Sequence, residues 1–216
     1  MLRHGRTYLE AIDLRLYLIR HGETEYNAVG RMQGWQEIPL NDAGIAQASL
    51  LGQRLTGTRI DHIYSSDIRR TVMTACIVAA HTGTSISYEP LYRERNPGDL
   101  TDLEYEHCEA FFTELDFEPP NGESPAVFNV RVREAFAKLI ELEGDSDRHI
   151  GVVTHGMVCN DFVKICLGYD PREDPDFHWP NTCLTICDYA DGKWTVDTLA
   201  CAAHLDEQPT GHATGG

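Results

Sequence analysis

Two histidines in this chain of 216 residues each follow an apolar run and precede a glycine. His21 comes after LYLIR and before Gly22, and His155 comes after IGVVT and before Gly156. An imidazole can attack, accept a proton or donate one near neutral pH, and a glycine allows the backbone to approach a ligand closely. A single histidine is usually a hydrogen-bonded side chain with no chemical role, but two in the same setting favour a shared site.

The first of these motifs occurs twice, because Arg-His-Gly-x-Thr is found at residues 3–7 and again at residues 20–24. Only three residues precede His4, so no strand can lead into it. The N-terminal copy is therefore interpreted as a coincidence within an irregular extension, and the prediction of a reactive histidine concerns His21.

Two further segments carry charges that could serve a site. SSDIRRTVMTA (65–75) places Arg69 and Arg70 at the start of a predicted helix, where free backbone N–H groups favour anions. A solvated basic helix start is the alternative. LYRERNPGDL (91–100) places Glu94 between two arginines, and spacing alone favours a surface ion-pair cluster over catalysis.

Apolar periodicity predicts the elements that must position these residues. Alternating leucines predict a strand over 14–20, and further strands are expected at 60–66, 85–90 and 149–156, with a hairpin formed by 183–189 and 193–199. Helices are expected from a cap at Asn41 to Gly57, from a cap at Ser66 or Asp67 to Gly83, over 103–115, from Ser124 to Gly144, and over 156–168.

Strands that alternate with helices predict an α/β fold, a three-layer sandwich with a mostly parallel central sheet and helices on both faces. Such sheets bind ligands beyond the carboxyl ends of their strands, which is where both histidines lie. We expect an extension over residues 1–13, one domain over 14–205, and a polar, glycine-rich tail over 206–216 that is disordered.

Composition limits the partners and the compartment. A formal charge of −16 opposes binding to nucleic acid or to an anionic membrane. The sequence has no apolar run long enough to span a bilayer, and no continuous apolar stretch of a signal peptide near its start. The seven cysteines are scattered without a Cys-x-x-Cys pair, which is typical of reduced thiols and gives little support to a zinc site. A cytoplasmic location is expected.

Taken in order, the motifs resemble those of the histidine phosphatase superfamily, in its phosphoglycerate mutase-like branch. The resemblance spans about residues 14–205. Its motifs are RHGET (20–24) with Asn27, GW (34–35), PLNDAG (39–44), SSDIRRTVMTA, LYRE (91–94), NGES (121–124) and THG (154–156). RHGxT alone is weak, as the N-terminal copy demonstrates, whereas the ordered set is specific.

The resemblance implies a role for each matching residue. The implied catalytic residues are His21, a nucleophile that becomes phosphohistidine, and Glu94, a general acid and base. The implied phosphate-binding residues are Arg20, Asn27, Arg70 and His155, and the implied substrate contacts are Gln33 and Gly34. A nucleophilic histidine must be neutral, and nearby cations favour this form. The family implies neither a metal ion nor a cofactor.

Some positions depart from the family pattern or have a simpler explanation. Asp102 replaces a glycine that many relatives carry, and Met157 follows His155-Gly156 where relatives often have a further glycine. Ser124 of NGES is interpreted as a helix cap. The pairs Asn181-Thr182 and His204-Leu205 also match late family positions and are interpreted as structural.

Three functions are compatible with this pattern. The favoured one is a phosphatase that hydrolyses a small phosphomonoester; the alternatives are a cofactor-dependent phosphoglycerate mutase and a non-catalytic module that binds phosphorylated ligands. Between Glu94 and Asn121 the only arginine or lysine is Arg95, and the segment carries many acidic residues. A second negative group on the substrate would gain little there, which favours hydrolysis. A homodimer is compatible with the sequence but not required by it.

Overall fold

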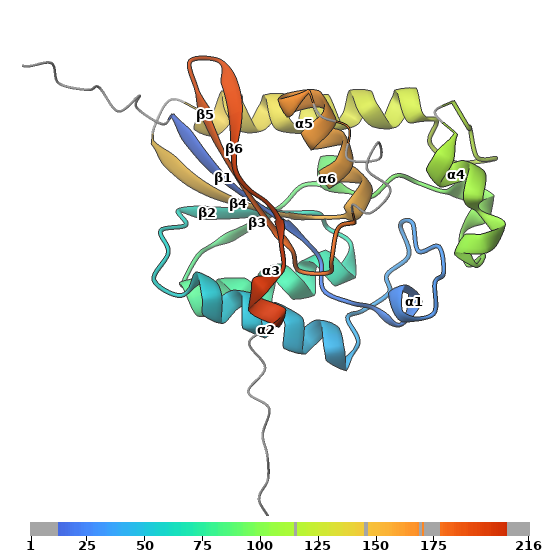
Figure 1. The fold of residues 1–216 in the computed structure, drawn as a ribbon, viewed down its shortest axis with the longest axis horizontal. Helices are drawn as coiled ribbons and strands as arrows, with labels where there is room; N and C mark the ends of the chain where they lie inside the picture. Colours follow the sequence, from blue (N-terminus) through green and yellow to red (C-terminus); the bar gives the residue numbers. More distant parts are fainter. Residues whose placement is uncertain (1–12, 115, 145–146, 169, 171–177, 207–216) are drawn as a thin grey trace, which may run out of the picture.

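The computed structural model describes residues 13–114, 116–144, 147–168, 170 and 178–206, so the expected extension and tail lie almost wholly outside the described residues. A six-stranded sheet in the order β3-β2-β4-β1-β5-β6 forms the centre of the molecule (Figure 1). Its strands are β1 (Leu14–Arg20), β2 (His62–Ser65), β3 (Ile86–Tyr88), β4 (Arg148–Thr154), β5 (Leu184–Ala190) and β6 (Lys193–Cys201). The first four strands run parallel, and the β5–β6 hairpin adds antiparallel neighbours beside β1.

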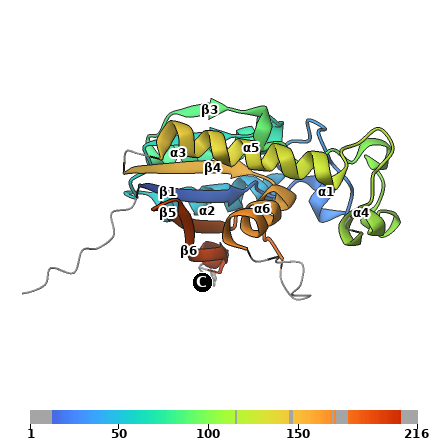
Figure 2. The same ribbon diagram turned by 90° about the horizontal axis from the view of Figure 1, so that it is seen from above.

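Helices cover both faces of this sheet, which confirms the expected three-layer sandwich (Figures 1 and 2). The α-helices are α1 (Glu25–Ala28), α2 (Asp42–Leu55), α3 (Arg69–Thr82), α4 (Glu109–Thr113), α5 (Pro125–Glu143) and α6 (Gly156–Phe162). A π-helical turn over Val163–Leu167 continues α6, and short 3-10 turns lie at Pro90–Tyr92, Gly98–Leu100, Tyr105–His107 and Ala203–Leu205. None of the described helices is both long and apolar enough to cross a membrane.

The alternation of side chains along β1 explains why helices are needed on both sides. Leu14, Leu16 and Leu18 belong to the core cluster that also contains the apolar residues of α5 and α6. Tyr17 and Ile19 point the other way, into the cluster formed with α2 and α3. Because successive strand residues face opposite sides and both sides here are apolar, the strand is buried on both faces, as parallel sheets usually are.

Two predicted helix caps are confirmed, and one is wrong. The Asn41 side chain accepts a hydrogen bond from Gly44 N at 2.8 Å at the start of α2, and Ser124 accepts one from Val127 N at 3.3 Å at the start of α5. Neither Ser66 nor Asp67 caps α3, because its cap position is Ile68. Both side chains have other partners, which the next subsection describes.

The single helix expected over 103–115 is also wrong in its extent. A 3-10 turn over Tyr105–His107 is followed by Cys108, whose backbone leaves helical geometry, and then by the short α4. Cys108 and Phe111 pack against Met32 in a small separate core. The break allows both residues to be buried while Tyr105 turns toward the neighbouring cavity.

Strand register brings the predicted site residues to one edge of the sheet. Arg20 at the end of β1 lies opposite Thr154 at the end of β4, so His21 and His155 follow at equivalent positions. Ser65 at the end of β2 pairs with Val153, and α3 begins a few residues later at the same edge. The expectation that folding joins these distant segments is confirmed.

Close packing of backbone at Gly22 and Gly44 fixes the turn that carries His21. A Cβ at Gly22 would lie 2.6 Å from Gly44 O, and a Cβ at Gly44 would lie 2.0 Å from Glu23 O. Neither position can accept a side chain unless this turn and α2 move apart.

We therefore expect Gly44→Ala to lower the free energy of unfolding in urea by about 2–3 kcal/mol, because overpacking against backbone cannot relax through a rotamer change. Displacement of the His21 turn should also lower activity. Ser49→Ala on the same helix is the matched control and should stay within about 0.5 kcal/mol of the wild type. Equal stability of the two variants would contradict this account.

Candidate active site

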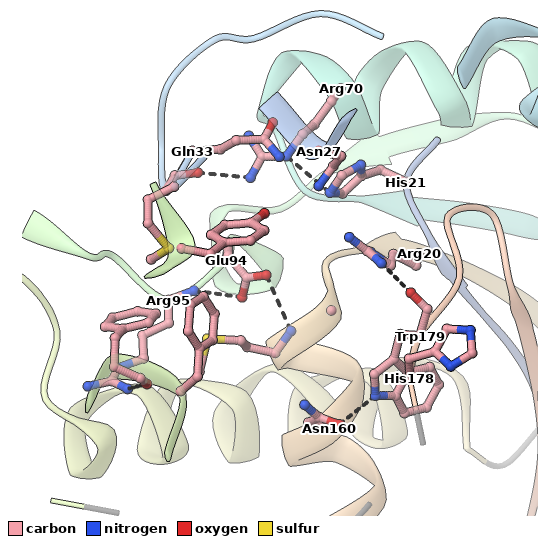
Figure 3. Close-up of a pocket in the computed structure, with 17 residues that line it drawn as sticks. Arg20, His21, Asn27, Gln33, Arg70, Glu94, Arg95, Asn160, His178 and Trp179 are labelled. Carbon is pink, nitrogen blue, oxygen red and sulfur yellow. Dashed lines mark hydrogen bonds between the residues drawn. The ribbon is translucent and has the colours of Figure 1, made fainter. Parts of the chain in front are cut away.

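A cavity of about 460 Å³ opens at the edge where β1, β2 and β4 end (Figure 3). Its polar part is lined by most of the residues that the sequence predicted for the site: Arg20, His21, Asn27, Gln33, Gly34, Arg70 and Glu94. The remaining predicted residue, His155, is fully buried and is not among the described residues that line the cavity.

His21 is held as a neutral imidazole. Its side chain is 3% exposed, and Nδ1 lies 2.7 Å from Gly22 O, so Nδ1 carries the proton and donates it to that carbonyl. Nε2 then has the free electron pair and accepts a hydrogen bond from Arg70 Nε at 3.2 Å. Burial, and then the positive charges of Arg70 and Arg20, lower the pKa of His21 well below its ordinary value.

Arg70 is a buried cation at the centre of the polar part. Besides His21, its guanidinium donates to the carbonyl oxygens of Gly34 at 2.8 Å and Gln36 at 3.2 Å. Burial lowers the pKa of Arg70 to about 10, which still leaves it charged at neutral pH. Neighbouring Arg69 is exposed.

His155 is buried beneath the cavity and contacts Arg70. Its Nδ1 accepts a hydrogen bond from Arg70 at 3.0 Å, and its Nε2 lies 3.0 Å from Ser66 Oγ. The ring centroids of His155 and His21 are 5.2 Å apart. Burial, followed by the charge of Arg70, lowers the pKa of His155 well below its ordinary value. Ser66 Oγ also accepts a long hydrogen bond from Ile68 N at 3.4 Å, so the hydroxyl lies between His155 and the residue that precedes α3.

Arg20 and Asn27 approach from β1 and α1. Arg20 donates to Trp179 O, and its buried Nε makes no hydrogen bond within the described part of the chain. Asn27 forms a capping box with Thr24 and is hydrogen-bonded to the hydroxyl of Tyr105. A buried donor without a partner is costly, so Arg20 Nε is suited to an incoming anion.

Glu94 lies across the cavity from His21 (Figure 3). Its carboxylate accepts hydrogen bonds from Arg95 N at 2.9 Å and from Met157 N at 3.3 Å. Burial raises the pKa of Glu94, and the two N–H groups and Arg70 offset this only in part. A carboxyl group with a raised pKa can hold a proton at the pH where His21 is neutral.

The arginines beside Glu94 are not the surface ion-pair cluster that spacing alone favoured. Arg95 is 3% exposed, donates to the backbone oxygens of Phe117 and Glu123, and stacks over the Phe111 ring at 4.2 Å. Arg93 pairs with both oxygens of Asp67, at 2.6 and 2.5 Å, which explains why Asp67 does not cap α3.

The two predicted substrate contacts, Gln33 and Gly34, line the cavity and also form hydrogen bonds with Thr24 and Arg70. Gly34 contributes the carbonyl that Arg70 binds, and Gln33 Oε1 accepts a hydrogen bond from Thr24 Oγ1 at 2.8 Å. Their contact with substrate stays a prediction.

The pair Asn181-Thr182 is more closely tied to the site than sequence reasoning indicated. The Asn181 side chain and the Thr182 backbone N–H both donate to the carbonyl oxygen of His21, at 3.0 and 3.2 Å. Thr182 has φ of 58°, which is rare for a β-branched residue. Its hydroxyl contacts His204 Nε2 at 2.9 Å. The strained backbone of Thr182 indicates that this residue helps to hold the His21 carbonyl. The strain cannot be recognised from the sequence.

Asp102 joins the loops around the cavity mouth. Its φ of 71° explains why glycine suits this position in the family. Its carboxylate accepts hydrogen bonds from Tyr26 OH at 2.5 Å and Gln36 Nε2 at 2.9 Å, and so links the loop after Gly98 to α1 and to the segment after Gly34.

We expect Asp102→Ala to be less stable than Asp102→Gly by about 1 kcal/mol, because alanine keeps the strained φ and glycine does not. Both variants lose the two hydrogen bonds, so both should raise KM with little change in kcat. Thermal unfolding and steady-state kinetics measure these effects. If alanine is tolerated as well as glycine, the backbone is not constrained at this position.

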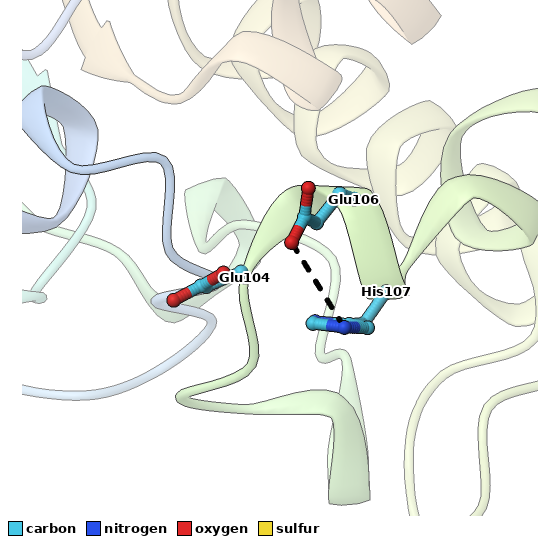
Figure 4. Close-up of side chains that lie close together, drawn as sticks. All are labelled: Glu104, Glu106 and His107. Carbon is cyan, nitrogen blue, oxygen red and sulfur yellow. Dashed lines mark ion pairs between the residues drawn. The ribbon is translucent and has the colours of Figure 1, made fainter.

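The acidic segment 104–118 does not turn its charges into the cavity. Glu104, Glu106, Glu109 and Glu114 are exposed, while Tyr105, Phe111 and Phe112 line the cavity. The described side chains that this segment contributes to the cavity are therefore aromatic, and the acidic charge considered in the sequence analysis lies at the surface. Glu104, Glu106 and His107 have side-chain ligand atoms within 4.8 Å of one another (Figure 4). Such exposed acidic groups are common, and these carry no argument for a metal.

Comparisons with known proteins agree with the geometry. The family model of the histidine phosphatase superfamily (branch 1) matches residues 16–202. A Yersinia pestis (strain Pestoides F) protein named "probable phosphoglycerate mutase GpmB" is 32% identical over 207 residues, which cover 89% of this chain and 95% of that protein.

Solved structures give the same assignment. YhfR from Bacillus stearothermophilus superposes with a TM-score of 0.79 at 28% identity, covering 89% of this chain and 99% of that one. A mycobacterial glucosyl-3-phosphoglycerate phosphatase superposes with a TM-score of 0.74 at 26% identity, covering 86% of this chain and 98% of that one. The chain therefore belongs to the histidine phosphatase superfamily, branch 1, and is an enzyme of that superfamily.

Proposed function

We propose that this enzyme hydrolyses small phosphomonoesters through a phosphohistidine intermediate on His21. One observation carries the proposal: the neutral Nε2 of His21 lies beside the buried cation of Arg70, and the carboxyl group of Glu94, whose pKa is raised by burial, lies across the same cavity. A nucleophile, an anion-binding cation and a proton donor are the parts that phosphoryl transfer requires.

In the first step Nε2 of His21 attacks phosphorus, and the bond from phosphorus to the ester oxygen breaks. Glu94 donates its proton to that oxygen, so the product leaves as a neutral alcohol. The negative charge on the phosphoryl oxygens is stabilised by Arg70 and by the unpartnered Nε of Arg20. Proton transfer from Nδ1 is not needed, because it stays bonded to Gly22 O.

In the second step Glu94, now a carboxylate, accepts a proton from water as the water oxygen attacks phosphorus. The bond between phosphorus and Nε2 breaks, and inorganic phosphate leaves. Glu94 thus returns to its protonated form and His21 to its neutral form. The same two residues serve both steps in opposite directions.

A mutase would share the first step but return the phosphoryl group to an organic acceptor. The Yersinia pestis relative is named a probable phosphoglycerate mutase, so a mutase is the second candidate function. Hydrolysis is favoured because the described lining places no arginine or lysine beside the rings of Tyr105, Phe111 and Phe112 except Arg95, which is bound to backbone oxygens.

The proposal is tested by trapping the intermediate and following the phosphoryl group. Labelled substrate should give an acid-labile, base-stable phosphoenzyme and release inorganic phosphate as the main product. Assays with 3-phosphoglycerate, with and without 2,3-bisphosphoglycerate, measure transfer. Faster isomerisation than phosphate release would identify a mutase, and binding without a phosphoenzyme would identify a non-catalytic module.

A further inference from the structure

The half of the cavity opposite the cations is lined by large apolar side chains. They come from four separate segments of the chain: Met32, Tyr105, Phe111, Phe112, Met157 and Trp179. We refer to these six residues as the apolar wall. Phosphate binding does not require this apolar surface, since a phosphoryl group would contact only the polar half of the cavity.

The aromatic rings of the apolar wall hold one another in fixed orientations. Tyr105 packs edge-to-face on Phe112 with ring centroids 5.4 Å apart, and Phe112 packs edge-to-face on Phe111 at 5.5 Å. Tyr105 and Phe112 nevertheless remain 37% and 40% exposed. Exposed aromatic side chains grouped beside a cavity are typical of a ligand-binding surface.

The arginines that line the cavity leave this half without a cation for a second anionic group. Arg20 and Arg70 lie at the phosphate end, beside His21. Arg95 is bound to backbone oxygens and covers the Phe111 ring, so its charge is directed into the protein. Asn160 and His178 also line the cavity, beside Trp179, but the described lining has no lysine and no arginine other than these three. A carboxylate or second phosphate packed on the rings of Tyr105, Phe111 and Phe112 would therefore have no cation as a partner.

We infer that the alcohol part of the natural substrate is an uncharged group carrying an aromatic ring, which packs against the apolar wall while its phosphate occupies the polar half. This inference rests on the proposed phosphatase function and narrows it to a substrate class. Glu94 lies between the Arg70–His21 pair and Arg95 (Figure 3), and the inference places the ester oxygen that joins ring and phosphate beside its carboxyl group. The ring would replace water on Tyr105 and Phe112.

The test compares substrates whose leaving groups differ in apolar surface but little in acidity. We expect kcat/KM for 2-phenylethyl phosphate to exceed that for ethyl phosphate by about 100-fold, since the added phenyl ring is withdrawn from water. Phe112→Ala should reduce this preference by about tenfold or more and leave ethyl phosphate within about twofold. Phe112→Leu should keep most of it.

Tyr88→Ala is the matched control, because Tyr88 is a half-exposed aromatic residue on β3 outside the cavity lining. It should leave the preference unchanged. Equal kcat/KM for the two esters, equal loss on both in Phe112→Ala, or a preference for 3-phosphoglycerate would overturn the inference. Failure of the proposed function is distinguishable, because then neither ester would release inorganic phosphate, whether or not a phosphoenzyme forms.

Discussion

His21→Ala should lower hydrolysis of 4-nitrophenyl phosphate by at least about 10⁴-fold, the scale of loss seen when a nucleophile is removed. Without Nε2 no bond to phosphorus can form, and the acid-labile phosphoenzyme should disappear. The loss should fall on kcat, because Arg70 and Arg20 remain to bind the phosphate. Steady-state kinetics and phosphoenzyme trapping measure the two effects.

His4→Ala is the natural control, since His4 belongs to the other copy of the Arg-His-Gly-x-Thr motif. It should retain full activity. Thermal unfolding should show that His21→Ala stays folded. Similar activity in the two variants would refute the assignment of the nucleophile.

Glu94→Gln should lower kcat/KM for an alkyl phosphate by about 10²–10⁴-fold, the usual contribution of a general acid. For 4-nitrophenyl phosphate the loss in kcat/KM should be much smaller, because nitrophenolate leaves without a proton. The contrast between the two substrates separates proton donation from a merely structural role. Equal losses on both would show that Glu94 does not protonate the leaving oxygen.

The pH dependence of the same variant gives an independent check. Glu94 must be protonated to donate, so rising pH lowers kcat/KM, and its raised pKa places this decline at higher pH than an ordinary carboxyl group would. His21 must be neutral, so falling pH lowers kcat/KM, and its lowered pKa places that decline well below 6.5. Glu94→Gln should abolish the alkaline decline only. Substrate ionisation affects both enzymes equally and cancels in the ratio of their kcat/KM values, so a ratio that does not change with rising pH would contradict the assignment.

The sequence predicted the sheet, its layers and the residues at its edge because these follow from local patterns. Alternating leucines predicted β1, and the two His-Gly pairs predicted a shared site on the single assumption that neighbouring parallel strands end at the same edge of the sheet. The α3 cap was wrong because the helix begins after Ile68, and the Ser66 and Asp67 side chains contact His155 and Arg93, which are distant in the sequence. Side chains of that kind favour caps only when nothing else competes for them.

The sequence also could not predict that the segment 104–118 presents apolar side chains to the cavity, because this too depends on tertiary contacts. Segment 104–118 is acidic in composition, and composition does not state which side chains turn inward. Burial of Cys108 and Phe111 orients the segment so that its carboxylates are exposed and its rings face the cavity. The positive φ of Thr182 is likewise set by tertiary contacts and leaves no trace in local sequence.

The pairing of Arg20 with Thr154 constrains how this protein can change over evolution. Because side chains alternate between faces along a strand, a one-residue insertion within β4 would turn His155 away from Arg70. An insertion between the elements would leave that contact intact. The length of β4 should therefore be conserved among active homologues. The connecting segments, which line the substrate side of the cavity, can vary in length.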